Sequence, residues 1–278
     1  ILDSDGKVLS WGENSYGQLG DNTKIQKTIP TRIDSLENIK NVYTFGSTSY
    51  AINTNGELYT WGYKYTETPT KLNFYSKVVQ VSGSILLAED GTVWYIGSNP
   101  TRVSGLSNIV EITAKDNYYY ALDANGHVWA WGYNGYGQLS QGNTSNSSVP
   151  VQVLIEGTEQ DENGDFIKTP IENIVEIVTA NCSILMRSEN GTLYACGYNG
   201  YGKLGLNNDK NVVIATATVD TNNIKNISTG SYHSVISNNA GFVYTSGYNG
   251  NGQLGNGTFD NSSKFEVIGD TYVHVTSN

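Results

Sequence analysis

Six tyrosines recur in a repeated segment rich in glycine and asparagine, and they are the side chains of this sequence best suited to bind another molecule. They are Tyr16, Tyr133, Tyr136, Tyr198, Tyr201 and Tyr248. A tyrosine ring provides a large contact area at low entropic cost, and tyrosine is enriched at the energetic centres of protein interfaces. The same ring also packs well against a neighbouring strand. The sequence leaves open whether these tyrosines bind a partner or stabilise the fold.

Residues for acid–base or metal chemistry do not form a recognisable set. His127 follows a hairpin turn and should be exposed, His233 lies in a strand connector, and His274 lies in the last predicted strand. No pattern brings a nucleophile, a base and an orienting carboxylate together. We therefore expect no catalytic residues, no enzymatic activity, no metal site and no cofactor.

One acidic segment, Asp161 to Asp165, resembles the start of a calcium-binding loop. The bidentate glutamate expected seven residues further on is missing, whereas Asn163-Gly164 is typical of a hairpin turn. We expect the tip of an extended hairpin formed by residues 151–156 and 165–168. Calcium binding at this segment is the alternative.

The tyrosines belong to a long internal repeat that is marked by glycines. A turn glycine occurs six times, at Gly6, Gly56, Gly91, Gly126, Gly191 and Gly241. The residue five places after each turn glycine occupies an equivalent position in every repeat, and the residue after it is always a closing glycine. The residues at this equivalent position are Trp11, Trp61, Ile96, Trp131, Cys196 and Ser246. Because a ring at the end of a strand mostly fills the space between sheets, we expect this position to be buried.

Each repeat is expected to form a four-stranded antiparallel sheet. In the fourth repeat, residues 109–113, 119–122, 128–131 and 149–153 read as strands, and Asn125-Gly126 provides a two-residue hairpin turn. Short strands that recur with a fixed period are typical of a β-propeller, in which each repeat is one blade. The predicted fold is therefore all-β, with six visible blades in a single domain spanning residues 1–278.

The two ends of the sequence each resemble half a blade. The chain begins in a second strand at Ile1-Leu2-Asp3 and stops after a first strand, Thr271 to Val275. We expect these halves to pair, because pairing would close the ring and remove two exposed sheet edges. The sequence has no initiator Met and no signal peptide, so we expect it to be a segment of a longer protein.

The pattern shared by the complete repeats resembles regulator of chromosome condensation repeats. It is carried by residues 11–20, 131–139, 197–205 and 247–255, whereas the second and third repeats keep only the central hairpin. The resemblance implies a β-propeller, with seven blades in the family's eukaryotic namesake. The family includes guanine-nucleotide exchange factors, a secreted β-lactamase inhibitor, a plant ultraviolet receptor and bacterial surface proteins, so the fold alone does not define a function.

Charge and composition exclude several classes of partner. The net charge is −10, and the sixteen Lys and Arg residues are scattered, which argues against nucleic acid and anionic lipid. No stretch has the roughly 20 apolar residues of a membrane span. We expect Cys182 and Cys196 to be buried free thiols.

These observations predict a non-catalytic, monomeric platform for a protein partner that binds at the tyrosine-bearing loops. Frequent Asn, Ile and Lys residues suggest a bacterial source, and we expect a surface or secreted protein, with the cytoplasm as the alternative. A secreted inhibitor of an enzyme is the second hypothesis, and a guanine-nucleotide exchange factor is the third.

Overall fold

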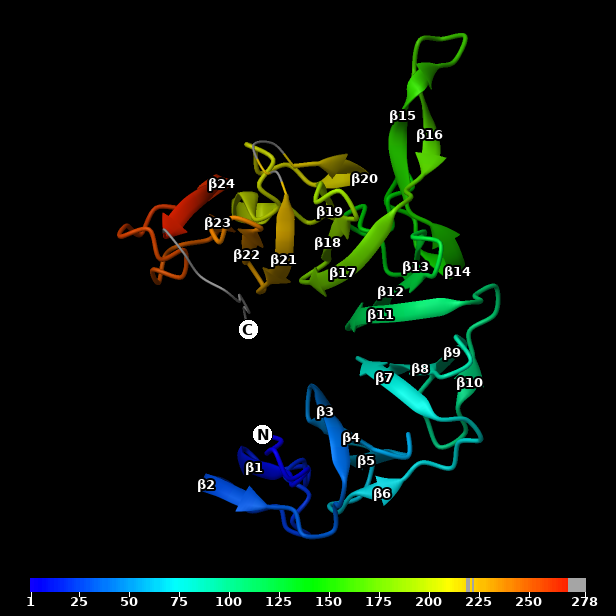
Figure 1. Cartoon of the computed structure of the whole chain (residues 1–278), viewed down its shortest axis with the longest axis vertical. Helices are drawn as coiled ribbons and strands as arrows, with labels where there is room; N and C mark the ends of the chain where they lie inside the picture. Colours follow the sequence, from blue (N-terminus) through cyan, green and yellow to red (C-terminus); the bar gives the residue numbers. More distant parts are fainter. Residues whose placement is uncertain (219–220, 222, 270–278) are drawn as a thin grey trace. The chain divides into compact units, whose positions relative to one another are not determined.

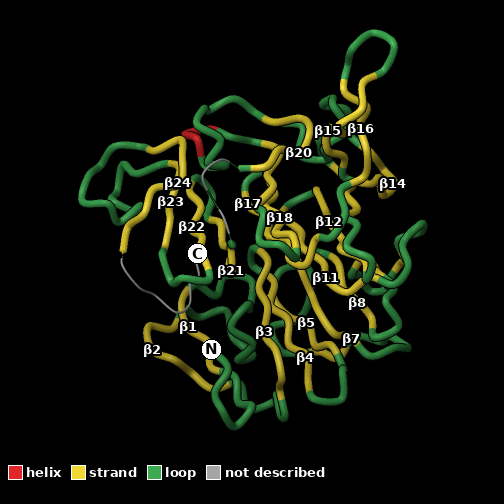
Figure 2. Tube along the Cα trace, turned by 45° about the horizontal axis from the view of Figure 1, so that its top comes forward, coloured by secondary structure: helices red, strands yellow, loops and turns green. Residues whose placement is uncertain are grey.

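The computed structural model describes residues 1–218, 221 and 223–269 of this chain, which fold as an all-β protein. Within these residues, the only regular elements besides strands are the three residues of one 3-10 turn, η1 (Gly200–Gly202) (Figure 2). The chain divides into two compact units, Ile1–Ile112 and Thr113–Asn278, which we call the N-terminal and C-terminal units. Short β-strands connected by turns therefore form both units (Figure 1).

The N-terminal unit contains three antiparallel sheets. The first consists of β1 (Leu9–Gly12) and β2 (Lys27–Arg32). The second has the order β3 (Ile39–Phe45), β4 (Thr48–Asn53), β5 (Leu58–Gly62), β6 (Thr70–Lys71). The third has the order β7 (Val78–Ser82), β8 (Ile85–Ala88), β9 (Val93–Tyr95), β10 (Thr101–Arg102).

The sheets of the C-terminal unit follow the same plan. One has the order β11 (Ile109–Lys115), β12 (Tyr118–Asp123), β13 (Val128–Gly132), β14 (Ser147–Gln152), and the unit boundary falls within β11. The next has the order β17 (Ile174–Ala180), β18 (Ser183–Ser188), β19 (Leu193–Gly197), β20 (Val212–Ala217), and is extended by two further strands, β15 (Leu154–Gln160) and β16 (Phe166–Pro170). The last has the order β21 (Ile224–Thr229), β22 (His233–Asn238), β23 (Val243–Gly247), β24 (Ser262–Gly269).

The predicted all-β class is confirmed, and the four predicted strands are present in the sheets of the second to sixth repeats, whereas the sheet of the first repeat has two strands among the described residues. The turn glycines all have positive φ, for example 83° at Gly126 and 81° at Gly191, as a two-residue hairpin turn requires. The predicted pairing of Thr271 to Val275 with Ile1-Leu2 lies outside the described residues, so ring closure stays a prediction. At the other end, Leu2 bridges to Val8.

The long insertion forms the predicted hairpin. Its tip is a turn in which Asp161 Oδ1 accepts hydrogen bonds from the backbone N–H groups of Asn163 (2.8 Å) and Asp165 (3.0 Å). The strands are longer than predicted, and Ile155 of β15 pairs in parallel with Ala215 of β20. The hairpin therefore joins the sheet of the following repeat, from which it extends outward (Figure 1). The residue pattern of a hairpin predicts its two antiparallel strands but not a parallel contact with another repeat.

The position five residues after each turn glycine is buried in most repeats, as predicted. Trp61, Trp131, Cys196 and Ser246 are all buried, whereas Ile96 is partly buried. The prediction is wrong for Trp11, whose side chain is 44% exposed. Trp61 Nε1 is hydrogen-bonded to the loop of the preceding repeat, whereas the Trp11 side chain has no such bond among the described residues.

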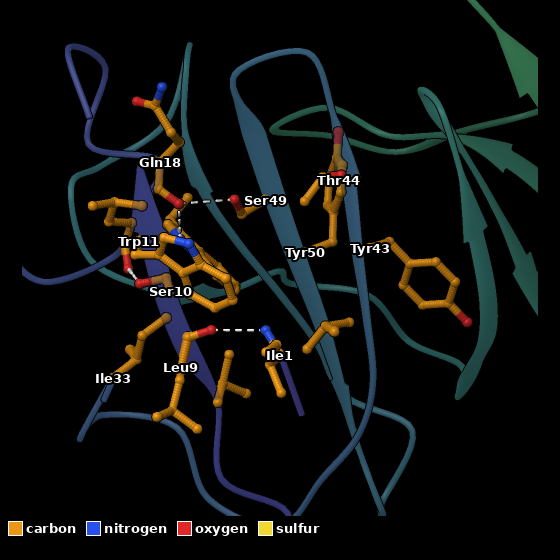
Figure 3. Close-up of a pocket in the computed structure, with 14 residues that line it drawn as sticks. Ile1, Leu9, Ser10, Trp11, Gln18, Ile33, Tyr43, Thr44, Ser49 and Tyr50 are labelled. Carbon is orange, nitrogen blue, oxygen red and sulfur yellow. Dashed lines mark hydrogen bonds between the residues drawn. The ribbon is translucent and has the colours of Figure 1, made fainter. Parts of the chain in front are cut away.

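Trp11 instead lines a pocket of about 280 Å³ in the N-terminal unit (Figure 3). Apolar side chains such as Leu9, Ile33 and Tyr50 form much of its wall. The terminal amino group of Ile1 donates a hydrogen bond to the carbonyl of Leu9 (2.8 Å) beside it. The pocket therefore lies beside the sheet of the first repeat, which has two strands in the described part of the chain.

The buried position has a second property that the sequence did not reveal, because three different side chains donate the same hydrogen bond. Trp61 Nε1 donates to the carbonyl of Gln18 (2.9 Å). Cys196 Sγ donates to the carbonyl of Gln138 (3.4 Å). Ser246 Oγ donates to the carbonyl of Lys203 (2.9 Å). Each donor thus ties its strand to the loop of the preceding repeat, which explains why Trp, Cys and Ser can occupy one position.

A buried asparagine closes each complete glycine-rich loop. The side-chain oxygen of Asn199 accepts the N–H of Leu204 (2.9 Å), and its amide nitrogen donates to the carbonyl of Asn208 (2.9 Å). The same arrangement recurs at Asn14, Asn134 and Asn249. All four are at most 1% exposed. These contacts satisfy backbone groups within each loop, and they fix the loop conformation from inside.

Replacing Asn134 by Ala should destabilise the fold. The variant would leave the N–H of Leu139 and the carbonyls of Asn143 and Ser145 without the partners they have now. Because each buried polar group left unsatisfied costs about 1–3 kcal/mol, we expect the free energy of unfolding to fall by about 3 kcal/mol or more in urea titrations. The matched control is Asn163→Ala at the exposed hairpin tip, which should change it little. A loss at Asn134 no larger than at Asn163 would contradict this role.

Candidate functional site

Six tyrosines of the C-terminal unit form one continuous row of ring contacts, which we call the tyrosine cluster. The ring centroids of successive pairs lie 5.0–6.5 Å apart, and four of the five pairs meet edge to face. In order of contact, the members are Tyr133, Tyr136, Tyr198, Tyr232, Tyr201 and Tyr248. Such edge contacts are favourable between aromatic rings, so the cluster links the loops of three consecutive repeats.

The repeat itself generates these contacts, because the second tyrosine of one loop packs against the first tyrosine of the next. Tyr136 meets Tyr198 at 5.2 Å, and Tyr201 meets Tyr248 at 5.0 Å. In the N-terminal unit, Tyr16 meets Tyr63 at 5.0 Å in the same way. The same packing therefore occurs at three junctions between repeats.

Glycine two residues later allows the first tyrosine of each loop to fold over its own backbone. A Cβ atom at Gly135, Gly200 or Gly250 would collide with the hydroxyl of Tyr133, Tyr198 or Tyr248, respectively. The sequence Tyr-Asn-Gly therefore specifies a ring that lies across the loop, with asparagine buried beneath it.

Tyr201 differs from its counterparts in its backbone. In the other loops, the side-chain oxygen of Gln18 or Gln138 accepts the N–H of Tyr16 or Tyr136 (3.0 Å each). Lys203 holds this position after Tyr201 and has no such acceptor. Tyr201 has φ 63°, a left-handed conformation that costs a non-glycine residue roughly 1–2 kcal/mol. Its side chain is 45% exposed, close to the 50% of Tyr16, so the left-handed residue keeps its ring in contact with solvent.

Lys203 is fully buried and points away from that loop. Its Nζ donates to the carbonyls of Ala180 (2.8 Å), Ser231 (3.3 Å) and Gly230 (3.4 Å). The last two carbonyls directly precede Tyr232, so Lys203 holds the connector that carries this ring. Burial lowers the pKa of Lys203 to about 7, because a low-dielectric interior disfavours the charged amine.

The structure brings together five of the six tyrosines predicted as site residues. Tyr16 lies in the N-terminal unit with Tyr63, and the cluster includes Tyr232, which the sequence analysis missed. Tyr63 could have been found from the repeat register, since it directly follows a closing glycine, as Tyr133 does. Tyr232 lies in a connector without a tyrosine in the other repeats, so no repeated signal marked it.

Both interpretations of these tyrosines retain support. Each ring packs on another, as the structural role requires, yet Tyr201 and Tyr232 stay 45% and 44% exposed. Burial raises the pKa of the Tyr198 hydroxyl, and the neighbouring tyrosines of the cluster add to the rise. The Tyr198 hydroxyl therefore stays neutral at neutral pH. Its role in binding a partner stays a prediction.

The histidines have separate surroundings. His127, predicted to be exposed, is partly buried, because its Nδ1 lies 3.2 Å from Asp123 Oδ2. Burial opposes ionisation of Asp123, but hydrogen bonds from Trp129, His127 and Asn125 hold its pKa below the ordinary value. Burial lowers the pKa of His233, and His274 lies outside the described residues.

Both cysteines are free thiols, as predicted. Cys196 is fully buried, and burial raises its pKa to about 12. Cys182 is only partly buried, because it occupies a turn with φ 59°, so that half of the prediction is wrong. Among the described residues, no cluster of three or more His, Cys, Asp and Glu could hold a metal ion. The same residues include no helix long and apolar enough to cross a membrane.

Comparison with known families identifies the repeat. The model of the regulator of chromosome condensation (RCC1) repeat matches residues 5–47, 125–168 and 190–237, and a second RCC1 repeat model matches residues 109–138. Together they cover more than half of the chain. The chain belongs to the RCC1 repeat family. The predicted family is therefore confirmed.

Similar proteins come from several eukaryotes. The chain is 27% identical over 243 residues to the human E3 ubiquitin-protein ligase HERC2, which covers 73% of this chain and 5% of HERC2. It is 27% identical over 229 residues to protein pim1 of Schizosaccharomyces pombe, which covers 77% of this chain and 38% of pim1. The chain thus spans well under half the length of these relatives.

A solved structure supports the same fold. Prp20p from Saccharomyces cerevisiae has a TM-score of 0.79 and 21% identity, with 97% of this chain and 74% of Prp20p covered. This likeness shows that the sheets described above are those of an RCC1-type β-propeller, in which each sheet is a blade.

The buried Lys203 should make stability depend on pH. Its pKa is about 7 in the fold against an ordinary value of 10.5, so the unfolded chain binds more protons between these values. Stability should therefore rise with pH between about 7 and 10.5. We expect the free energy of unfolding of the wild type, measured relative to Lys203→Met, to increase from pH 7 to pH 9. A constant difference would show that the three carbonyls keep the amine charged.

Proposed function

We propose that this RCC1 repeat chain is a non-catalytic platform that binds a protein partner through the tyrosine cluster. The observation that supports this most directly is the unbroken row of six rings across the loops of three repeats, with two rings nearly half exposed. Rigid aromatic side chains supply most of the binding energy at many protein interfaces. Tyr16, paired with Tyr63 in the N-terminal unit, is proposed as a further contact.

Relatives support a protein partner. Prp20p is described through its binding to Gsp1p and histones, and it has been solved in complex with Kap60. These partners belong to Prp20p, and the likeness shows only that an RCC1-type propeller can present protein-binding surfaces. The identity of the partner of this chain is left open by that likeness.

The charge of the chain supports a protein rather than a nucleic acid. The net charge of −10 would repel the phosphates of a nucleic acid, and the Lys and Arg residues that could offset this repulsion are scattered along the sequence. We propose a monomer that acts at a bacterial surface or after secretion, with the cytoplasm as the alternative compartment. Inhibition of an enzyme is a special case of the same function, since an inhibitor binds tightly and is not turned over. A guanine-nucleotide exchange factor would instead accelerate nucleotide release from its partner.

Changing Tyr136 and Tyr201 together to Ala should weaken partner binding. These are the two rings that bridge consecutive loops, and each hot-spot aromatic is worth about 2 kcal/mol or more. With about 1.4 kcal/mol per tenfold change, Kd should rise at least ~30-fold. The partner would be captured from lysate and culture fluid of the source organism, identified by mass spectrometry, and its affinity measured by calorimetry.

A control separates binding from folding. Tyr75→Ala removes an exposed ring of the N-terminal unit outside the cluster and should leave affinity unchanged. The double variant should keep the circular dichroism spectrum of the wild type. A folded double variant with wild-type affinity would place the interface elsewhere, and a double variant that unfolds would show that these tyrosines serve packing.

We also propose that residues 1–278 form one propeller of six blades, closed by pairing of Thr271 to Val275 with Ile1-Leu2. Deleting residues 271–278 would then leave sheet edges open, which promotes aggregation. We expect a large drop in Tm, whereas deletion of residues 276–278 alone should have little effect. A monomeric 271–278 deletion with unchanged Tm would contradict closure.

A further inference from the structure

A cleft of about 540 Å³ lies between the loops of two consecutive repeats in the C-terminal unit. Two rings of the tyrosine cluster line it together with polar groups, and this volume suits a side chain or small ligand. The lining residues are Tyr198, Gly200, Tyr201, Asn208, Asp209, Asn261 and Ser263.

Hydrogen bonds hold both walls of the cleft in place. The N–H of Asn207 donates to the carbonyl of Ser263 (2.8 Å), which ties one loop to the strand of the next repeat. The N–H of Asn249 donates to Asn261 Oδ1 (2.7 Å). Gly202 has φ 75°, and a Cβ atom there would collide with the backbone of Ser263. The cleft is therefore formed before any ligand arrives, which lowers the entropic cost of binding.

Asp209 is the one charged residue among those that line this cleft. It is exposed and takes part in none of the ion pairs found within the described part of the chain. The nearby Lys210 and Lys264 are exposed and do not line the cleft. The carboxylate therefore remains available to a cation from outside.

The acidic residue is specific to this repeat. Asp209 follows the buried Asn199 by ten residues, and the same spacing leads to Lys24, Thr144 and Phe259 after the other three loop asparagines. Because Asp, Lys, Thr and Phe all occur at this position, the fold of the loop does not require an acidic residue there. The carboxylate is therefore a property of this cleft and not of the repeat.

The C-terminal unit as a whole favours a basic partner. Residues 113–278 contain seven Lys and Arg against fifteen Asp and Glu, a formal charge of −8. A field of this sign attracts a positively charged segment and raises its association rate. A basic partner would therefore match both the negative charge of the C-terminal unit and the carboxylate in the cleft.

We propose that this cleft binds an arginine side chain of the protein partner, with the guanidinium against the ring of Tyr198 or Tyr201 and paired with the carboxylate of Asp209. Arginine fits better than lysine because its planar group can stack on an aromatic ring while it donates two parallel hydrogen bonds to a carboxylate. The inference rests on the proposed function, since it names the chemistry of the partner at the tyrosine cluster.

The test uses the whole chain and a fluorescein-labelled heptapeptide in which three arginines alternate with glycines. We expect saturable binding of one peptide per chain by fluorescence anisotropy. The lysine version should bind about threefold or more weakly and the citrulline version, which keeps the shape but not the charge, at least about tenfold more weakly. Asp209→Asn should raise the Kd of the arginine peptide at least about fivefold.

Glu189→Gln is the matched control. It removes one exposed carboxylate from the same repeat, at the hairpin turn that precedes β19, whereas the cleft lies after that strand. Its Kd should stay within about twofold of the wild type, since an exposed and distant charge is screened. An equal effect of both substitutions, or no effect of Asp209→Asn, would overturn the arginine site.

This outcome is separable from that of the proposed function. If Asp209→Asn leaves peptide binding unchanged while the tyrosine variants still lose the captured partner, the arginine site is wrong and the platform stands. If Asp209→Asn weakens the peptide while the tyrosine variants keep the partner, the cleft binds cations and the protein interface lies elsewhere.

Discussion

The buried asparagine amide is the interaction on which the loops of this protein depend. One side chain accepts a backbone N–H five residues ahead and donates to a carbonyl nine residues ahead, as Asn199 does with Leu204 and Asn208. An irregular segment has no neighbouring strand to satisfy its backbone, so an internal amide must do so. With its polar groups paired from within, the loop can turn its outer surface, the tyrosines included, toward solvent.

Much of the fold could be predicted from the sequence because its main signals are local and repeated. The fixed spacing from Gly126 to Trp131 sets a hairpin and its register without knowledge of distant residues. Contacts between repeats were harder to predict. The parallel pairing of Ile155 with Ala215 joins segments sixty residues apart, and the hydrogen bond of Trp61 reaches the loop that carries Gln18. The repeat pattern of the sequence does not indicate which repeats contact one another in these ways.

The candidate site shows the same division. Six tyrosines at repeated positions were identified, although Tyr63 was not, and five of them meet because the repeat carries each ring to an equivalent place. Tyr232 was missed since it reaches the cluster from a connector held by Lys203. The inward direction of that lysine also escaped prediction, because a lysine in a polar loop is ordinarily solvated. Tyr201, two residues before this lysine, is left-handed, whereas in two other loops a glutamine at the lysine's position accepts the N–H of the corresponding tyrosine.

The hydrogen bond shared by Trp61, Cys196 and Ser246 has a consequence for how such repeats diverge. Its acceptor is a main-chain carbonyl, which every amino acid supplies, so the bond places a requirement only on the side chain that donates. An indole, a thiol and a hydroxyl differ greatly in bulk, and the neighbouring packing must adjust to each. Junctions between repeats can therefore drift in size while their alignment is preserved. The outer loops of one repeat can therefore change, and with them the binding specificity, while the hydrogen bonds between repeats are kept.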